Sequence, residues 1–264
     1  MTVASERPGF FIPYRHAASV RPCAYPALEP IFLAAEPEML SSLARTERHA
    51  AQLHARSGPP PRPRFDQEWF PRLDAAQAYS LVRAQHPGRI VEIGSGHSTR
   101  FLAQAIADAG SPTELHCIDP EPRADIQALP LSHHARRLEE LDAQALAALL
   151  GPGDILFVDS SHLLVPGGDV DRIVNDLLPR LPSGVLLHVH DIFLPDPYPD
   201  AWTWRGYAEQ SLIAVLLHAG GWRLLWSSHW LATRHAARIA AGPLSTLPLR
   251  PGVPETSLWL VRTS

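Results

Sequence analysis

The chain has 264 residues, a length that can bury one sizeable hydrophobic core together with a helical extension. Its residues are 45% hydrophobic and 19% charged, and a net charge of −4 argues against a nucleic-acid partner. Two cysteines cannot form a disulfide framework, and no apolar run is long enough to span a membrane. The start of the chain also lacks a basic segment followed by an apolar one, so we expect a cytoplasmic protein.

The N-terminal quarter of the chain differs in composition from the rest. Residues 1–65 are rich in proline and end in the run from Gly58 to Pro63. Within them, Glu36–Arg56 predicts one polar helix that stops before this run. We therefore interpret residues 1–65 as a helical N-terminal cap and residues 66–264 as the main domain. The main domain is expected to begin with a helix over Asp74–Gln85.

From Arg89 onward, expected strands and helices alternate. Strands are predicted over Arg89–Ile93, Glu114–Ile118, Ala135–Glu139, Ile155–Val158 and Val185–His190. Helices are predicted over Thr99–Ala109, Arg123–Ala128, Ala143–Leu150 and Val170–Leu178. Repeated strand–helix units predict a parallel sheet with right-handed crossovers, which is an α/β fold.

The C-terminal part of the pattern differs from these repeats. A helix is predicted over Trp204–Ala219, followed by a strand over Trp222–Ser227. The last predicted strand, Ser257–Val261, follows a long non-helical connection over Pro243–Glu255. We therefore expect the two final strands to form a hairpin, with the last strand antiparallel to its neighbours.

A glycine turn follows the first predicted strand, and a helix is expected directly after it. The turn is Gly94-Ser95-Gly96, whose glycines allow unusual backbone angles and close approach of a ligand. The third glycine of the dinucleotide-binding fingerprint is missing, because Thr99 takes its place. Glu92 precedes the turn, and its carboxylate would repel a diphosphate but attract an ammonium or sulfonium group.

Asp119 follows the second predicted strand. It comes 23 residues after Gly96, the distance that one helix and one strand require. A carboxylate at that position can accept hydrogen bonds from both hydroxyl groups of a ribose. The alternative interpretation is that Asp119 only caps the end of the strand.

These motifs resemble the class I S-adenosylmethionine-dependent methyltransferases over about residues 65–264. The stretches Glu92–Arg100 and Asp159–His162 look in particular like a bacterial family that methylates sugars and other small molecules. The resemblance implies a Rossmann-like sheet, with S-adenosylmethionine held by the glycine turn and by the acid after the second strand. The predicted cofactor contacts are Glu92, Gly94, Ser95, Gly96, Asp119 and Asp159.

His162 is the candidate general base. It lies three residues after Asp159, at the edge of the sheet where ligands bind in open α/β folds. Transfer of a methyl group to a hydroxyl requires removal of the hydroxyl proton, and a neutral imidazole accepts a proton near pH 7. The metal-dependent catechol-type O-methyltransferases, which the chain resembles at the strand tips only, carry a lysine base at this spacing. The alternative is a capping or surface histidine.

A divalent metal site is predicted from Asp159, His190 and Asp191. The last two lie at the end of the fifth predicted strand, where the catechol-type enzymes carry an Asp-Asn pair. Imidazole suits Mn²⁺, Fe²⁺ or Zn²⁺ better than Mg²⁺, so the metal stays undetermined. The alternative is that His190 and Asp191 contact substrate or cap the strand.

The favoured hypothesis is O-methylation of a hydroxyl on a small polar molecule, with His162 as base and a divalent metal as an optional aid. Metal-free methylation of nitrogen or carbon, and a catalytically silent S-adenosylmethionine-binding protein, are the alternatives. A nicotinamide oxidoreductase is disfavoured by Glu92 and by the missing third glycine. We expect a small-molecule partner and no nucleic acid or membrane partner, with both a monomer and a homo-oligomer left open.

Overall fold

The computed structural model describes residues 15–16 and 19–264, which contain a seven-stranded sheet of order β3-β2-β1-β4-β5-β7-β6. Strands β1 to β5 are parallel, and β7 runs antiparallel to both β5 and β6. This order and the single antiparallel strand confirm the predicted α/β sheet. The strands are β1 Arg89–Ile93, β2 Glu114–Ile118, β3 Ser132–His134, β4 Ile155–Val158, β5 Leu186–Val189, β6 Trp222–Ser227 and β7 Leu258–Arg262.

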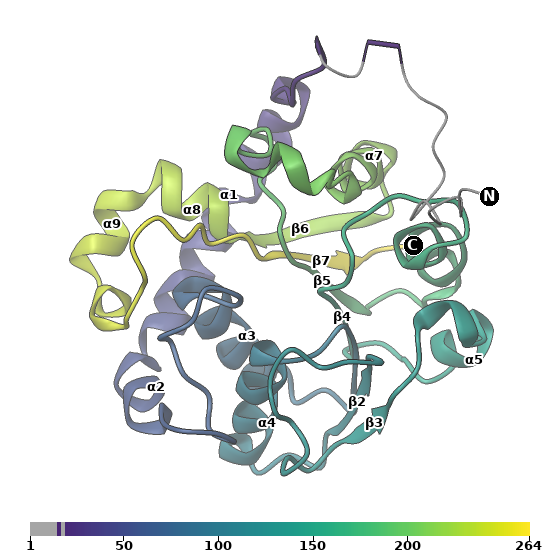
Figure 1. Ribbon diagram of the computed structural model, residues 1–264. Coiled ribbons are helices and arrows are strands. Elements are labelled where there is room, and N and C mark those ends of the chain that lie inside the picture. The colour runs from purple at the N-terminus through teal and green to yellow at the C-terminus, as the bar shows by residue number, and fades with distance from the viewer. Residues whose placement is uncertain (1–14, 17–18) are drawn as a thin grey trace, which may run out of the picture.

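Helices cover the sheet on both sides. Figure 1 shows α3 and α4 on one side of the strands and α5 on the other. The helices are α1 Glu29–Glu47, α2 Ala50–Arg56, α3 Arg72–Gln85, α4 His97–Ala109, α5 Ala143–Ala147, α6 Asp169–Arg172, α7 Glu209–Ala219, α8 Ser228–Arg234 and α9 Ala236–Ala241. None of the helices in the described ranges is long and apolar enough to cross a membrane.

The N-terminal helices pack into the same hydrophobic core as the sheet. Phe32, Met39 and Leu43 of α1 are fully buried in the cluster that also contains the strand side chains. The Phe32 ring lies 5.4 Å from the ring of Trp230, near the other end of the chain. The helix α1 therefore contributes directly to the main core. The division of the chain into an N-terminal cap over residues 1–65 and a main domain stays a prediction.

Four predicted elements in the first two thirds of the chain differ from the structure. The predicted helix 36–56 is two helices, and α1 already begins at Glu29 because Pro30 occupies the first turn, where its missing N–H costs no hydrogen bond. The third strand lies at Ser132–His134 rather than 135–139. The helix predicted over 123–128 is a loop whose Arg123 N–H bonds Ser95 O. The helix predicted over 170–178 starts as α6 and continues as a π-helical turn.

The C-terminal region is more helical than predicted. The helix expected from Trp204 begins at Glu209, because Gly206 adopts a left-handed conformation and separates α7 from a 3₁₀ segment, Asp200–Arg205. The connection between β6 and β7 contains α8, α9 and a 3₁₀ turn at Pro243–Thr246. β6 and β7 are nevertheless paired antiparallel, as expected.

Gly94, directly after β1, lies close against the residue that follows β4. Its φ is +78°, and a Cβ atom there would lie 1.9 Å from the carbonyl oxygen of Asp159. The Asp159 N–H bonds Ile93 O at 2.9 Å, so the two strand ends are held together. Only glycine satisfies both the backbone angle and the space, and this fixes Ser95 and Asp159 on neighbouring sides of one opening.

We expect Gly94→Ala to destabilise the fold by more than Gly110→Ala. Gly110 has a similar left-handed φ of +60°, but a Cβ atom there meets nothing within 4 Å. Gly110→Ala therefore adds backbone strain of about 1 kcal/mol, whereas Gly94→Ala adds overpacking of about 1–3 kcal/mol to the same strain. Chemical denaturation of both variants measures the difference. Equal losses would show that the β1–β4 approach is not tight.

Candidate functional site

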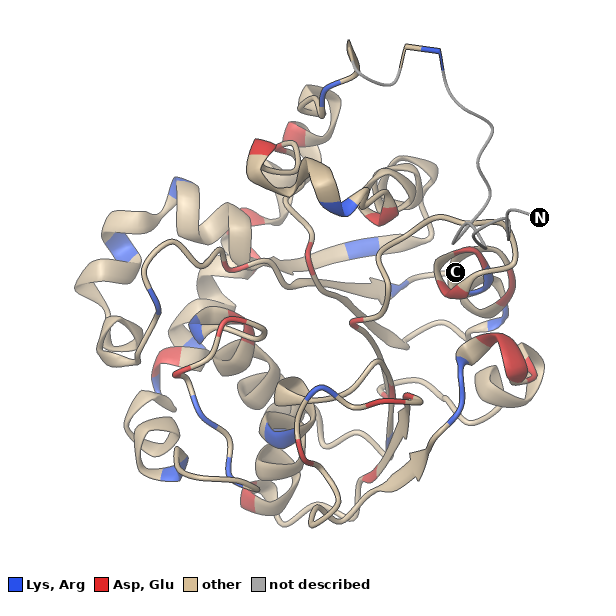
Figure 2. Ribbon diagram, viewed as in Figure 1, with Lys and Arg blue, Asp and Glu red and all other residues tan. Residues whose placement is uncertain are grey.

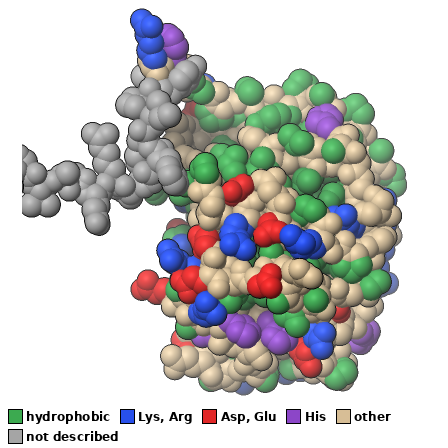
Figure 3. All heavy atoms as spheres, turned by 90° about the vertical axis from the view of Figure 1, so that its right-hand side faces the viewer, with side chains coloured by type: hydrophobic (Ala, Val, Ile, Leu, Met, Phe, Trp, Pro, Cys, Tyr) green, Lys and Arg blue, Asp and Glu red, His purple; other side chains and the backbone are tan. Residues whose placement is uncertain are grey.

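A cavity of about 570 Å³ opens at the carboxyl ends of the strands. It is lined by residues that follow β1, β2, β4 and β5, together with residues before α3 and between β5 and α7. Acidic and basic positions are spread over the whole fold (Figure 2), and on the face shown in Figure 3 arginine and acidic side chains alternate. The cavity, rather than a region of uniform charge, is therefore the candidate site.

The glycine turn and Asp119 form one wall of this cavity. The Ser95 N–H and the Ser95 hydroxyl donate to Asp119 Oδ2 at 2.7 and 3.1 Å, and the Glu121 N–H donates to Oδ1 at 2.8 Å. The Gly96 N–H donates to Thr99 Oγ1 at 2.8 Å, which joins the turn to the first turn of α4. The predicted residues Gly94, Ser95, Gly96 and Asp119 are thus brought together at the cavity surface.

Glu92 lies behind this wall rather than on it. Its carboxylate is fully buried and accepts hydrogen bonds from the Ser98 and Thr99 hydroxyls at 2.6 and 2.7 Å, and from Cys117 Sγ at 3.2 Å. It is not among the residues that line the cavity. Glu92 therefore organises the glycine turn and the start of α4, and a direct contact with a ligand stays a prediction.

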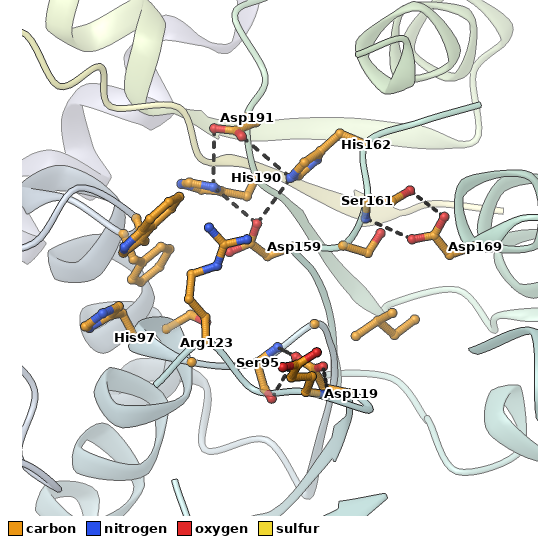
Figure 4. Close-up of a pocket in the computed structure, with 18 of the residues that line it drawn as sticks. Ser95, His97, Asp119, Arg123, Asp159, Ser161, His162, Asp169, His190 and Asp191 are labelled. Atoms are coloured by element: carbon orange, nitrogen blue, oxygen red, sulfur yellow. Dashed lines mark hydrogen bonds and ion pairs between the residues drawn. The ribbon is translucent and has the colours of Figure 1, made fainter. Parts of the chain in front are cut away.

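Asp159, His162, His190 and Asp191 form a closed ring of contacts at the tips of β4 and β5 (Figure 4). Asp159 Oδ1 lies 3.4 Å from His162 Nε2 and 3.5 Å from His190 Nδ1. Asp191 completes the ring, with Oδ2 3.6 Å from His162 Nε2 and Oδ1 3.5 Å from His190 Nδ1. The four side chains named from the sequence thus converge, and all four line the cavity.

Two buried carboxylates that the sequence analysis missed hold the outer nitrogens of these histidines. Glu209, the first residue of α7, lies 2.8 Å from His162 Nδ1, and Asp74 of α3 lies 3.1 Å from His190 Nε2. Asp74 also accepts the N–H groups of Thr256 and Ser257 at 3.0 and 2.9 Å. No local motif marks either acid, because 47 residues separate Glu209 from His162 and 116 separate Asp74 from His190.

The charges of this cluster change the protonation of the two histidines. Burial by itself lowers the pKa of His162, but Asp159, Glu209 and Asp191 outweigh it and raise that pKa well above 6.5. Burial opposes the same change at His190, where Asp159, Asp191 and Asp74 raise the pKa well above 6.5. Both rings are therefore charged at neutral pH, whereas the sequence analysis expected a neutral His162.

The three predicted metal ligands lie together, but their arrangement is that of an ion-pair cluster. Within the described ranges, no group of three or more His, Cys, Asp and Glu side chains has the geometry of a metal site. The contacts of Asp159 and Asp191 with the histidine nitrogens are those of carboxylates next to imidazolium rings. The structure thus gives the predicted residues a common location without showing a metal site.

Aromatic side chains also line the cavity. Two of them, Trp202 and Tyr207, come from the segment between β5 and α7. The Tyr207 ring lies 4.7 Å from the His162 ring, and Trp202 and Arg205 line the same cavity. Trp69 is 46% exposed and stacks on Arg123, whose guanidinium carbon lies 3.9 Å from the ring centre.

Comparisons with known proteins bear on this site. Residues 91–192 match a family model described as a methyltransferase domain. This segment runs from β1 to just beyond β5 and contains the glycine turn, Asp119 and the four-residue ring. A search of curated protein sequences finds no significant match.

Several solved structures are similar to the chain at low identity. One is a methyltransferase of Podospora anserina bound to S-adenosylhomocysteine, at 16% identity and a TM-score of 0.47, covering 97% of this chain and 100% of that one. Another is an O-methyltransferase of Bacillus cereus, at 12% identity and 0.43, covering 91% and 96%. A third is the mycinamycin-pathway methyltransferase MycE, at 14% and 0.40, covering 83% and 54%. The family model thus shows similarity to a methyltransferase domain over residues 91–192.

We expect Glu92 to make stability fall as pH rises from about 4.5 to about 7. Burial raises its pKa from 4.5 to about 7, so in this range the folded state holds a proton that the unfolded state has released. Stability from this group is therefore full at low pH and is lost as pH rises through the folded pKa. Over this range the loss is about 3 kcal/mol.

Glu92→Gln removes this titration while keeping the side-chain shape. Urea denaturation of both proteins, without ligand, at pH values between 4.5 and 8 gives the comparison. The glutamine variant should gain stability relative to the original chain as pH rises. Parallel curves for the two proteins would show that this carboxylate does not titrate in the folded state.

Proposed function

We propose that this chain is a class I S-adenosylmethionine-dependent methyltransferase and that it transfers the methyl group to a hydroxyl of a small polar molecule. The observation that carries the proposal is the location of His162. It lies in the same cavity as the glycine turn and Asp119, with one nitrogen held by Glu209. The imidazole that would take up the proton therefore lies in the same cavity as the site proposed for the cofactor.

The cofactor is proposed to lie along the wall formed by the glycine turn and Asp119. Gly94 and Gly96 leave the main chain open to the methionine part, and Asp119 is available to the ribose hydroxyls. Asp159, which lies between this wall and the histidines, can face the ammonium group. The sulfonium methyl then points toward the side of the cavity that holds His162 and Asp191.

His162 is proposed to receive the proton of the acceptor hydroxyl. The hydroxyl oxygen attacks the methyl carbon, the bond between carbon and sulfur breaks, and S-adenosylhomocysteine leaves with the electron pair on sulfur. Because Glu209 holds Nδ1, the proton moves to Nε2, the nitrogen that faces Asp159 and Asp191. In the resting cluster His162 is protonated, so catalysis requires that Nε2 first loses its proton. Transfer to nitrogen or carbon is the alternative and needs no such base.

A divalent cation is a second proposal for the same cluster. Its support is charge and chemistry: Asp74, Asp159, Asp191 and Glu209 surround two imidazole rings, and one divalent cation carries the same charge as the two protons that it would replace. Asp159, His190 and Asp191 would hold it. Such a cation would lower the pKa of the acceptor hydroxyl and orient it. The resting contacts are those of ion pairs, so no step above depends on it.

We expect His162→Ala to lower kcat by roughly 10²- to 10⁴-fold, the range for loss of a general base, with little change in affinity for S-adenosylhomocysteine. His229→Ala is the matched control, because His229 also pairs with a carboxylate, Asp196, at 2.8 Å but does not line the cavity. Steady-state rates with an identified acceptor and calorimetric titration with the product measure both effects. A His162→Ala enzyme with the original kcat removes this residue from the mechanism.

If the cation proposal is correct, we expect the purified chain to hold one divalent ion. EDTA should remove this ion and abolish activity, and the Asp191→Asn variant should not bind it. The reason is that the neutral amide keeps the shape of Asp191 but removes the charge that a cation requires. Metal content is measured by mass spectrometry, and activity by methyl transfer. If fully chelated protein reacts at the untreated rate, His162 acts without a cation.

A further inference from the structure

Arg205 lines the cavity, and its guanidinium has an incomplete set of contacts. It ends the 3₁₀ segment Asp200–Arg205, and its guanidinium carbon lies 4.0 Å from the centre of the Trp202 ring. Its Nη1 donates a hydrogen bond to the hydroxyl of Tyr207 at 3.1 Å. The Nε atom is buried without a hydrogen-bond partner among the described residues, and the nearest paired carboxylate, Asp191, is 4.0 Å from Nη1.

Other arginines of this chain bind carboxylates directly. Arg72 donates to both oxygens of Glu255 at 3.0 and 2.8 Å, although its side chain is only 14% exposed. Arg136 and Arg137, which line the same cavity, both bond to Glu140. Arg205 is 25% exposed and has no comparable partner in the described part of the chain. A half-buried cation without a bonded counter-ion is costly, so this position favours an anion brought by a ligand.

The geometry of Arg205 suits a planar anion. Stacking on Trp202 fixes the plane of the guanidinium, Nη1 contacts Tyr207, and Nη2 has no hydrogen-bond partner among the described residues. Nη1 and Nη2 together carry N–H groups in one plane, which can meet the two oxygens of a carboxylate. A neutral hydroxyl could use one of them, but only a planar oxyanion uses both and also balances the charge.

Arg205 also lies next to the proposed base. Asp191 Oδ2 is 4.0 Å from Arg205 Nη1 and 3.6 Å from His162 Nε2. The separation of these two nitrogens therefore cannot exceed the sum of the two distances. A hydroxyl at His162 and a carboxylate at Arg205 would then be separated by only a few bonds. A molecule of monosaccharide size spans this distance.

We propose that Arg205 binds a carboxylate of the methyl acceptor, so that the acceptor is a small organic acid that also carries the hydroxyl to be methylated. This inference rests on the proposed methyltransferase function and narrows its substrate class. The carboxylate of the cofactor's methionine part is the other source of the same chemistry. Arg205 lies beside Asp191, which follows β5, and β4 separates β5 from β1 and its glycine turn, so the acceptor is the source we assign.

The test uses the protein saturated with S-adenosylhomocysteine, with D-glucuronate and D-glucose as probes that differ only in the carboxylate. Saturation-transfer NMR should show binding of glucuronate and not of glucose. Arg205→Gln should weaken glucuronate binding roughly ten- to hundred-fold, the loss expected for hydrogen bonds to a charged group. Arg205→Lys should restore part of it, since lysine keeps the charge but not the paired donors. Arg136→Gln is the matched control and should bind glucuronate normally.

Three results would overturn the assignment: equal signals from the two sugars, no signal from either, or glucuronate binding that survives in Arg205→Gln. Calorimetry with S-adenosylhomocysteine separates the two sources of carboxylate. Unchanged affinity in Arg205→Gln supports the acceptor, whereas a ten-fold loss assigns the guanidinium to the cofactor and contradicts the proposal. The same calorimetry shows whether the original chain binds S-adenosylhomocysteine, and failure to bind it would count against the methyltransferase proposal itself. The sugars are therefore also tested without S-adenosylhomocysteine, so that the two proposals are judged separately.

Discussion

The arrangement of buried charges around two histidines determines how this site is built. Asp74, Glu209 and Asp191 are each at most 8% exposed, and His162 and His190 at most 4%. Isolated buried carboxylates are unfavourable, so they must be paired with cations or take up protons. The two imidazolium rings provide those cations, and each ring contacts carboxylates from different elements. The chemistry at the strand tips therefore exists only when β4, β5, α3 and α7 have all packed.

That dependence gives each helix a role in the site beyond covering the sheet. α3 begins at the point where Asp74 reaches His190 and also bonds the backbone just before β7. α7 begins with Glu209, whose carboxylate fixes one nitrogen of His162 and leaves the other toward the cavity. Carboxylates that orient histidine rings in this way are common around both general bases and metal ligands. The same framework therefore serves either proposal for the cluster.

The sequence predicted the site best where the polar residues directly follow a strand in the chain. The bounds of β1, β2 and β4 follow from short apolar runs, and the residues directly after them were correctly expected at one edge of the sheet. Three features escaped prediction for physical reasons. Asp74, Glu209 and Arg205 acquire their roles from tertiary packing, which no local spacing records. The protonation of His162 depends on three carboxylates whose positions only the fold reveals. The helices α8 and α9, of seven and six residues, are too short to be stable without tertiary contacts.

The central claim is that the wall formed by the glycine turn and Asp119 binds S-adenosylmethionine. Calorimetric titration with S-adenosylhomocysteine, set beside NAD⁺ and repeated on Asp119→Ala, tests it most directly. The account predicts one equivalent of S-adenosylhomocysteine bound, no binding of NAD⁺, and a loss of about 1.5–3 kcal/mol of binding free energy in the variant, the cost of removing hydrogen bonds to a charged group. Failure to bind S-adenosylhomocysteine, equal binding of NAD⁺, or unchanged affinity in Asp119→Ala would contradict it.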